Sequence, residues 1–238
     1  MSKHGLMEDV GMGDAMGEEG YKAGLDLAFN DIKDMNSDWR SVLPLARQMK
    51  REKGEQVRQG KELMFLDRGK VRLVFQSMEG EEKILWYAHD GCIFGEVPYF
   101  DPIPNECIFT CAADCVIYAF SEQALQRIGR ERPDLILNLF QSMARKLRIV
   151  TYHASSLSVD DMLARICKFL SRRIVPGSSP LRAKIGISRQ EMASLLGMHR
   201  ISLYKVLRRQ EELGLFGSIR GKSITILRPQ EFYKLVEQ

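Results

Sequence analysis

Hydrophobic and polar positions between Ile187 and Phe216 follow the pattern of two short amphipathic helices. Ser188 and Glu191 have the spacing of a capping box, directly before the apolar residues of the first helix. Gly197 ends that helix, and the second begins near Arg200. The inward face of the second helix carries Leu203, Val206, Leu207 and Gln210, and its outward face carries Ile201, Lys205, Arg208 and Arg209. This pattern predicts a helix-turn-helix, whose second helix inserts in the major groove of DNA.

An ordinary helical hairpin with a solvated basic face has a similar pattern, and the residues after Phe216 distinguish the two. β-branched and polar residues alternate from Gly217 to Leu227 around an Arg-Gly-Lys turn, which predicts two short strands forming a wing with a basic tip. Residues 159–238 carry fifteen Lys and Arg against seven Asp and Glu, a net charge of +8, whereas residues 1–158 carry −4. Positive charge concentrated at the motif is typical of a phosphate-binding surface.

Between Lys53 and Phe120 the chain consists of short β-forming runs separated by turn residues. The predicted strands are 63–66, 71–75, 84–88, 107–111 and 115–120, with turns at 67–70, 79–81 and 90–91. Many short strands at nearly regular spacing predict a compact β-sandwich or barrel. Residues 21–50 carry apolar residues at helical spacing in places and predict short helices.

A long helix is predicted after the strands. A short helical segment runs from Ser121 through Ile128, and Pro133 then begins a longer helix that reaches about Leu157. Apolar residues recur along it at alternating steps of four and three, the heptad spacing of a coiled-coil seam. The seam residues are Ile136, Phe140, Met143, Leu147, Val150, Ala154 and Leu157. A core helix has similar spacing, but helix-turn-helix proteins usually bind paired half-sites as two-fold dimers, so we interpret the seam as a dimerisation interface.

These patterns divide the chain into four parts and give it an α+β fold class. We expect an N-terminal tail with short helices (1–52), a β-domain (53–131), a dimerisation helix (132–157) and a winged helix-turn-helix domain (158–238). The last domain is expected to open with a helix over 158–175, continue through a loop at 176–180 and close with a helix over 229–238.

The composition bounds the class of protein. A chain of 238 residues that is 45% hydrophobic and 28% charged is globular and long enough for two domains. No stretch approaches eighteen apolar residues and the N-terminus lacks the pattern of a signal peptide, so we expect a cytoplasmic protein without a membrane partner. Five cysteines suit reduced thiols better than a disulfide scaffold. The absence of a nucleophile-base set, a phosphate loop or a metal motif argues against an enzyme.

A β-domain, a long helix and a winged helix-turn-helix in this order resemble the cyclic-AMP receptor protein and fumarate-nitrate regulator (Crp/Fnr) superfamily of bacterial transcription factors. The resemblance covers about residues 53–230, and its most specific part is the segment 187–207. The β-domain adds Gly69-Lys70-Val71-Arg72-Leu73 and Gly91-Cys92-Ile93-Phe94-Gly95-Glu96, which are similar to the glycine-punctuated strands of the family. The resemblance implies a cyclic-nucleotide-binding-like β-roll (jelly-roll) as the effector-sensing domain.

The resemblance also implies roles for individual residues at the DNA. Arg189 matches a phosphate-contacting position, and Arg200 matches the arginine that reads guanine through its O6 and N7 atoms. Ile201 stands where much of the family has glutamate, and it can meet a thymine methyl group. Lys205 stands where the family often has arginine, so the operator half-site should differ from the best-known one. The full expected DNA-binding set is Arg189, His199, Arg200, Ile201, Ser202, Lys205, Arg209, Arg220 and Lys222.

The effector expected from the residues is not cyclic AMP. In family members that bind cyclic nucleotides, a pair matching Gly95-Glu96 holds the ribose, and an Arg-Ser or Arg-Thr pair about ten residues later neutralises the phosphate. This chain has Glu106-Cys107 at the later position, and it has no Arg or Lys between Lys83 and Arg127. An acidic residue repels the anionic phosphate. Gly95 and Glu96 then have a structural explanation, as a turn and a salt bridge.

Three other sensing chemistries remain, which are thiol redox, haem and a small organic ligand, whereas an iron-sulfur cluster is not expected. The cluster-bearing branch of the family groups most of its ligands near the N-terminus, where this chain has no cysteine. Cys107 and Cys111 are separated by about 13 Å in an extended strand, too far to share a metal. A β-hairpin turn at Ala113-Asp114 can bring Cys111 near Cys115 as a thiol redox pair. Haem needs an axial ligand, for which His89 and His153 are candidates.

A small organic ligand is a further candidate effector, since aromatic residues of the β-domain can line a pocket. The candidate effector-binding residues are Trp86, Tyr87, His89, Gly95, Glu96, Phe109 and His153. The sequence therefore predicts a homodimeric transcription regulator that binds a palindromic operator in double-stranded DNA, contacts RNA polymerase and responds to an effector other than cyclic AMP. The alternative is an architectural DNA-binding protein without an effector.

Overall fold

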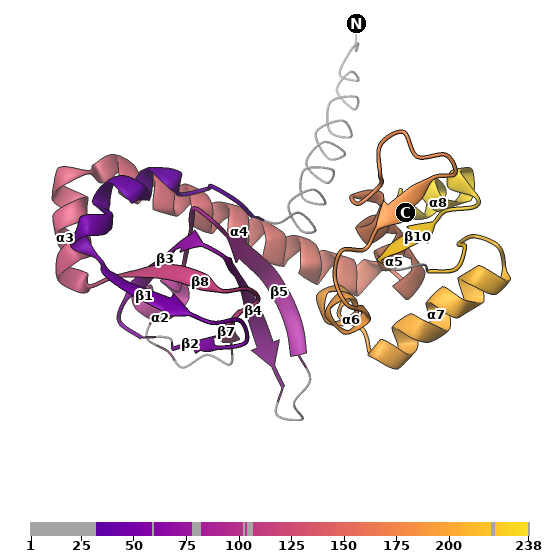
Figure 1. Cartoon of the computed structure of the whole chain (residues 1–238), viewed down its shortest axis with the longest axis horizontal. Coiled ribbons are helices and arrows are strands. Elements are labelled where there is room, and N and C mark those ends of the chain that lie inside the picture. Colours follow the sequence, from indigo (N-terminus) through magenta and orange to yellow (C-terminus); the bar gives the residue numbers. More distant parts are fainter. Residues whose placement is uncertain are drawn as a thin grey trace, which may run out of the picture.

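The computed structural model describes residues 32–58, 60–77, 82–101, 103, 107–219 and 222–237. These residues form a β-domain at one end and a helical domain at the other, and the long helix α4 (Pro133–Val159) runs between them (Figure 1). Most of the predicted N-terminal tail, residues 1–31, lies outside the described residues. The two-domain, mixed helix-and-sheet architecture agrees with the predicted α+β fold class.

The β-domain consists of two four-stranded antiparallel sheets. The first has the order β1 (Arg47–Arg51), β8 (Cys115–Phe120), β3 (Leu63–Arg68), β6 (Cys92–Phe94), and the second has the order β2 (Gln56–Val57), β7 (Cys107–Cys111), β4 (Lys70–Gln76), β5 (Glu82–His89). Met64 and Leu66 of β3 face the core between the sheets, whereas Leu63 and Phe65 face the helices on the other side. Because both faces of β3 are covered, its sequence is continuously apolar rather than alternating.

Three strands of this domain were not predicted. Strands β1, β2 and β6 are short, and β1 lies in the segment predicted as helical. The described part of that segment contains one helix, a 3-10 helix η1 (Ser37–Leu45), but the chain then pairs with β8 from Arg47 to Arg51. The polar sequence of β1 suits its position at the edge of the sheet, where one side faces water, and for this reason it has no strand-like alternation.

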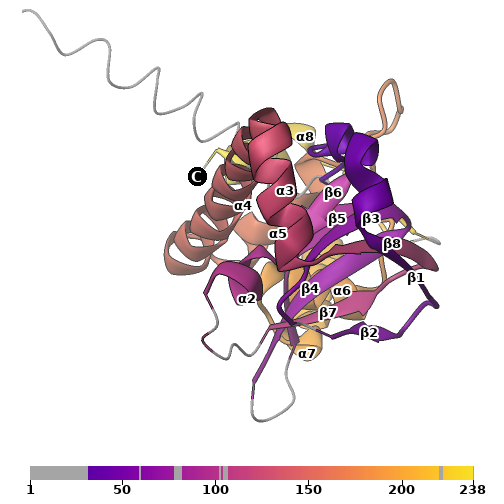
Figure 2. The ribbon, with the colours of Figure 1, turned by 90° about the vertical axis from the view of Figure 1, so that its left-hand side faces the viewer.

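Helices α3 (Glu122–Glu131) and α4 lie along one side of the sheets (Figure 2). Ser121 caps α3 by accepting a hydrogen bond from the Ala124 amide, and Pro133 occupies the first turn of α4. Leu135 and Leu139 of α4 are buried against the β-domain, beside Trp39 and Phe120. Of the predicted seam residues, Phe140, Leu147, Val150, Ala154 and Leu157 are exposed, whereas Ile136 and Met143 are half-buried and pack against the β-domain core.

The first helix of the C-terminal domain begins later than predicted. Helix α4 continues to Val159, Asp160 ends it, and Asp161 caps α5 (Met162–Ser171), so the predicted helix start at residue 158 is wrong. Asp160 has a local reason for this break, because its carboxylate accepts hydrogen bonds from Ser156 Oγ at 2.6 Å and from Lys168 Nζ at 2.7 Å. This ion pair is almost fully buried and ties α5 to the end of α4.

The predicted wing is only partly correct. Strand β10 (Ser223–Thr225) forms as expected, but it pairs with β9 (Arg182–Lys184), which follows the loop at 176–180 and was not predicted. Among the described residues, 217–219 form no strand, and a single bridge joins Phe216 to Ile226. Helices α6 (Arg189–Leu196), α7 (Arg200–Glu212) and α8 (Pro229–Val236) complete the domain around a core of Phe169, Met192, Leu195, Phe216 and Phe232.

Candidate DNA interface and effector cavity

Helix α6 and the turn after it have the geometry that the sequence predicts. Ser188 Oγ accepts a hydrogen bond from the Glu191 amide at 3.1 Å, and the Glu191 carboxylate accepts one from the Ser188 amide at 2.9 Å, which completes the capping box. Gly197 adopts the left-handed conformation with φ 61°. A Cβ atom at this position would lie 2.7 Å from Leu157 Cδ2, a flexible side-chain end that can shift, so the left-handed backbone is the reason that the turn favours glycine.

Helix α7 places a basic face in solvent. Leu203 and Leu207 are buried in the domain core, whereas the Ile201 side chain is 67% exposed on the opposite face. Exposed cations border Ile201 along the helix: Arg200, Lys205, Arg208 and Arg209. An exposed helix with cations at both ends, supported by a preceding helix, can enter the major groove while its side chains reach phosphates and base edges.

The predicted DNA-binding residues lie mainly on this surface. Arg189 is the first residue of α6, His199 directly precedes α7, and both are exposed. Arg189, Arg200 and Ile201 line one hollow between the two helices. Ser202 is half-buried, Lys222 is exposed beside β10, and Arg220 lies outside the described residues. Tyr204 lines the same hollow and is exposed, but it was not predicted, although an aromatic residue three positions after Ile201 was visible in the sequence.

The helix-turn-helix also packs against the β-domain. Strand β5 lies at the edge of its sheet, and Ser194 of α6 completes that edge: its hydroxyl accepts a hydrogen bond from the Ile84 amide at 2.9 Å and donates one to the Glu82 carbonyl at 2.6 Å. Lys83 donates a hydrogen bond to the Leu195 carbonyl at the end of α6. Burial and then the charge of Arg165 lower the pKa of Lys83 to about 8.

A cavity of about 470 Å³ lies between the β-domain and α4. Its lining is largely apolar and consists of Leu73, Leu85, Trp86, Glu96, Val97, Pro98, Cys107, Phe109, Met143, Ala144, Lys146, Leu147 and Val150. A β-bulge explains why the consecutive residues Leu85 and Trp86 both reach it, since the pairing of β5 with β4 shifts register between Leu73 and Val74. The volume and lining suit a small organic molecule.

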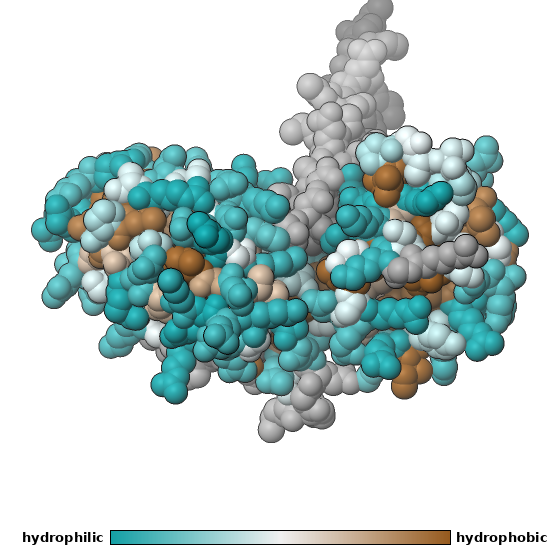
Figure 3. Space-filling model, viewed as in Figure 1, coloured by the Kyte–Doolittle hydropathy of each residue, from teal (hydrophilic) through white to brown (hydrophobic). Residues whose placement is uncertain are grey.

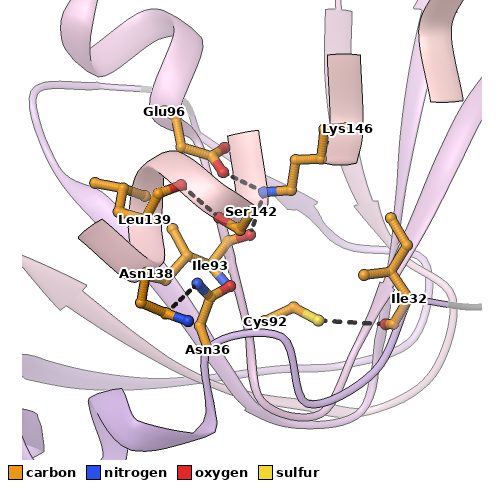
Figure 4. Close-up of polar contacts among 9 residues, drawn as sticks. All are labelled: Ile32, Asn36, Cys92, Ile93, Glu96, Asn138, Leu139, Ser142 and Lys146. Atoms are coloured by element: carbon orange, nitrogen blue, oxygen red, sulfur yellow. Dashed lines mark hydrogen bonds and ion pairs between the residues drawn. The ribbon is translucent and has the colours of Figure 1, made fainter. Parts of the chain in front are cut away.

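Glu96 and Lys146 supply the charged groups of the cavity wall (Figure 4). Lys146 Nζ donates hydrogen bonds to the Glu96 carboxylate and, at 2.7 Å, to the Ile93 carbonyl. The same ammonium lies 4.7 Å from the centre of the Trp86 ring. Gly95 precedes Glu96 in the left-handed conformation, at the start of α2 (Glu96–Phe100). Glu96 therefore has the turn and the salt bridge that were predicted for it.

Only three of the predicted effector residues, Trp86, Glu96 and Phe109, line this cavity. Tyr87 packs with the core of the C-terminal domain instead, and the Lys70 ammonium lies 4.0 Å from its ring centre. His89 ends β5, and its amide donates a hydrogen bond to the Ile32 carbonyl. His153 is buried on α4, where burial and then the Lys83 charge lower its pKa to about 3. The two histidines proposed as haem ligands thus lie outside the cavity wall.

Cys111 and Cys115 approach each other, as the sequence predicts. The interaction between the two thiols raises the pKa of Cys111 and lowers that of Cys115. The turn between them is not a β-hairpin, because β7 and β8 belong to different sheets. Among the described residues, no three His, Cys, Asp or Glu side chains gather in a way that could hold a metal ion. The described helices include none with the length and apolar character of a membrane span.

Two family models match the chain in the order of its domains. The model described as cyclic nucleotide-binding domain matches residues 53–132, and the model described as Crp-like helix-turn-helix domain matches residues 164–235. The first covers both sheets from β2 onward and α3, and the second covers α5 to α8.

Relatives and solved structures agree with these matches. The cAMP-activated global transcriptional regulator CRP of Salmonella typhimurium is 26% identical over 168 residues, which is 69% of this chain and 80% of that protein. A structure of OCPA-complexed CprK has a TM-score of 0.68 at 18% identity and covers 82% of this chain and 92% of that one. The c-di-GMP responsive regulator CLP of Xanthomonas campestris has a TM-score of 0.69 at 23% identity, with coverages of 79% and 97%.

Proposed function

The chain belongs to the Crp/Fnr family of DNA-binding transcription regulators, and from this premise we propose that it is a homodimer controlled by an effector other than cyclic AMP. Its proposed partners are a palindromic operator in double-stranded DNA, a second copy of the chain and RNA polymerase, and its proposed place of action is the cytoplasm. The observation that carries the proposal is the exposed basic face of α7, with Arg200 in its first turn and Ile201 at 67% exposure.

Arg200 is the proposed base reader, because a guanidinium can donate two hydrogen bonds to guanine. We expect Arg200→Ala to lower the affinity for the operator by about 1–3 kcal/mol and to leave the affinity for random DNA nearly unchanged. The operator is first selected from a random duplex pool with the wild-type protein, and binding is then measured by fluorescence anisotropy. Lys222→Ala is the matched control, since loss of a phosphate contact should weaken both duplexes alike. Equal losses on both duplexes for Arg200→Ala would contradict base reading.

The proposed effector site is the cavity beside Trp86, and the proposed effector is a small organic molecule. Glu96, which would hold a ribose in a cyclic-nucleotide site, is already paired with Lys146. The sequence places Glu106 where a phosphate-binding arginine would be expected. Relatives are named for different effectors, which are cAMP, OCPA and c-di-GMP, so the effector is expected to differ within the family.

Tryptophan fluorescence tests this site, because the chain has two tryptophans and only Trp86 lines the cavity. Trp39 is fully buried in another cluster and gives a constant background. A compound that binds should change the emission of the wild type and not that of Trp86→Phe, and it should change the affinity for the selected operator. If DNA affinity stayed constant across organic compounds, haemin and redox states, the effector-independent architectural alternative would replace this proposal.

Thiol redox sensing is a second candidate mode of control, favoured by the interaction of the Cys111 and Cys115 thiols, which shifts the pKa of each. A redox effect on DNA affinity that Cys111→Ser abolishes would support it over an organic ligand. An absorption spectrum with added haemin tests the haem candidate separately. A Soret band that is lost on replacing His89 or His153 would favour haem.

A further inference from the structure

Helix α7 exposes two large side chains with apolar surface on the face that carries its cations. Ile201 is 67% exposed and Tyr204 is 49% exposed, although the neighbouring Leu203 and Leu207 are buried. Figure 3 shows a hydrophobic patch in hydrophilic surroundings near the beginning of α7. An exposed isoleucine in the first turn of a helix adds neither helix propensity nor packing. The exposure of this apolar side chain therefore needs another explanation.

Tyr204 is held in place along the helix. Arg208 Nη1 lies 3.4 Å from Tyr204 Oη, and Arg208 Nε lies 3.3 Å from the Glu212 carboxylate. Tyr204 also stands between two hollows of the surface, one next to Arg200 and Ile201 and the other next to Ile219 and Ile224. Its ring therefore protrudes from the same surface as Arg200, the proposed base-reading residue.

The charge around these two residues identifies DNA as the occupant of this face. Arg200, Lys205, Arg208 and Arg209 are all exposed on α7, and they attract phosphates. Within the major groove the thymine methyl is the one apolar group that a base pair displays. Resting on the proposed function, we propose that Ile201 and Tyr204 form a thymine-reading pair and that Tyr204 is a specificity-determining residue of this regulator.

The spacing along the helix locates the thymines. Arg200 and Tyr204 are four residues apart, which is a rise of about 6 Å in an α-helix. Successive bases of one strand are about 3.4 Å apart, so the thymines should lie within about two base steps of the guanine that Arg200 reads. The expected half-site is therefore a guanine with thymines close by, and neither Ile201 nor Tyr204 discriminates between bases without methyl groups.

Replacing thymine by deoxyuridine tests this inference, because it removes only the methyl group. Duplexes are selected from a random pool with the full-length wild-type protein at low ionic strength, and the enriched site is resynthesised with uracil at each thymine near the guanine. We expect affinity to fall about fourfold for each methyl that is read, the equivalent of one buried methylene. Tyr204→Ser should lose the sensitivity at one position, whereas Tyr204→Phe should keep it because the ring remains.

The outcomes separate this inference from the proposed function. If no sequence is enriched, sequence-specific DNA binding fails and the inference fails with it. Two other results would leave sequence-specific DNA binding supported and would overturn thymine reading by Tyr204. In the first, a site is enriched but the uracil duplex binds as well as the thymine duplex. In the second, a site is enriched but Tyr204→Ser and the wild type respond alike to uracil. Circular dichroism checks that each variant keeps its helices, which is expected because Leu203 and Leu207 are unchanged.

Discussion

His153 is a titratable side chain whose protonation is set by its surroundings. It is 6% exposed on α4, and burial together with the nearby Lys83 charge lowers its pKa to about 3. A histidine in the unfolded chain has a pKa of about 6.5. The unfolded chain therefore takes up a proton between about pH 6.5 and about pH 3, whereas the folded chain does not. Falling pH in this window favours unfolding.

A comparison with His153→Gln isolates this contribution. The free energy of unfolding is measured by urea titration from pH 7 to pH 4 for both proteins. We expect the wild type to lose stability more steeply below about pH 6.5 by up to about 1.4 kcal/mol per pH unit, the value for one proton. Carboxylates affect both proteins alike and cancel in the difference. Parallel curves would mean that His153 titrates normally in the folded protein.

The roles of single residues could be predicted from the sequence where they depend only on neighbouring residues in the chain. The capping box of Ser188 and Glu191 and the glycine turn at Gly197 follow from spacing and backbone conformation alone, and the structure contains both. Lys146 was missed, although it neutralises Glu96, because it lies 50 positions further along the chain. The segment from Glu96 to the end of the β-strands contains no Lys or Arg. The Glu96–Lys146 pair forms only because α4 packs across the β-domain.

Among the secondary-structure elements, strand β5 connects the cavity to the helix-turn-helix. Leu85 and Trp86 line the cavity, and the preceding residues Lys83 and Ile84 bond to α6. A ligand that displaces Trp86 thus acts on the strand that holds the DNA-binding domain. If the cavity is the effector site, as proposed, β5 would transmit effector binding to the DNA-binding domain, provided that the effector binds with different affinity when α6 is docked on β5 and when it is not.

The contact between α6 and β5 can be tested at Ser194. Ser194→Ala removes the acceptor of the Ile84 amide and the donor to the Glu82 carbonyl. One net hydrogen bond contributes about 1 kcal/mol, so we expect hydrogen exchange of the Ile84 amide to accelerate by at least about fivefold. Exchange of the Phe65 amide in β3 should stay constant.

Ser158→Ala is the matched control for this substitution. The Ser158 hydroxyl is exposed and donates to the Ala154 carbonyl within α4, so its loss should leave the Ile84 amide protected. Unchanged exchange of Ile84 in Ser194→Ala would mean that α6 does not rest on β5 in solution.

Elements were predictable where periodicity is strong and uninterrupted. Strands 107–111 and 115–120 and the start of α4 at Pro133 agree with the structure. The prediction of a first wing strand at 217–219 was wrong, because the alternating pattern there was taken to mean pairing with the next strand. Strand β10 instead pairs with β9, which is distant in sequence. The docking of α6 on β5 could not be predicted, since edge-strand pairing with a serine side chain has no sequence pattern of its own.

At the scale of the whole molecule, α4 has one face packed on the β-domain and another that is largely exposed among the described residues. Leu135, Leu139 and Ile149 are buried against the β-domain. The seam face, in contrast, exposes Phe140 at 60%, Leu147 at 67% and Leu157 at 45%. A stripe of apolar residues this long at heptad spacing fits a second copy of the same helix. Leu147 and Val150 also line the cavity, so a partner helix would lie beside the bound effector.

Leu147→Lys tests the dimer, because two-fold symmetry would place the two lysines opposite each other in the seam. We expect sedimentation equilibrium to give twice the 27.2 kDa of one chain for the wild type and a single chain for the variant. Val159→Lys is the control, since Val159 is 74% exposed but lies off the heptad seam, and it should remain dimeric.

The same variants separate assembly from DNA recognition. A monomer keeps α7 intact and should still bind one half-site, but it loses the second half-site about 34 Å away and with it most of the affinity for a palindrome. Leu147→Lys should therefore bind palindromic and single half-site duplexes equally, whereas the wild type should prefer the palindrome. A dimeric Leu147→Lys protein would place the interface elsewhere on the molecule. A monomeric wild type that still preferred palindromes would mean that DNA, rather than α4, brings the two copies together.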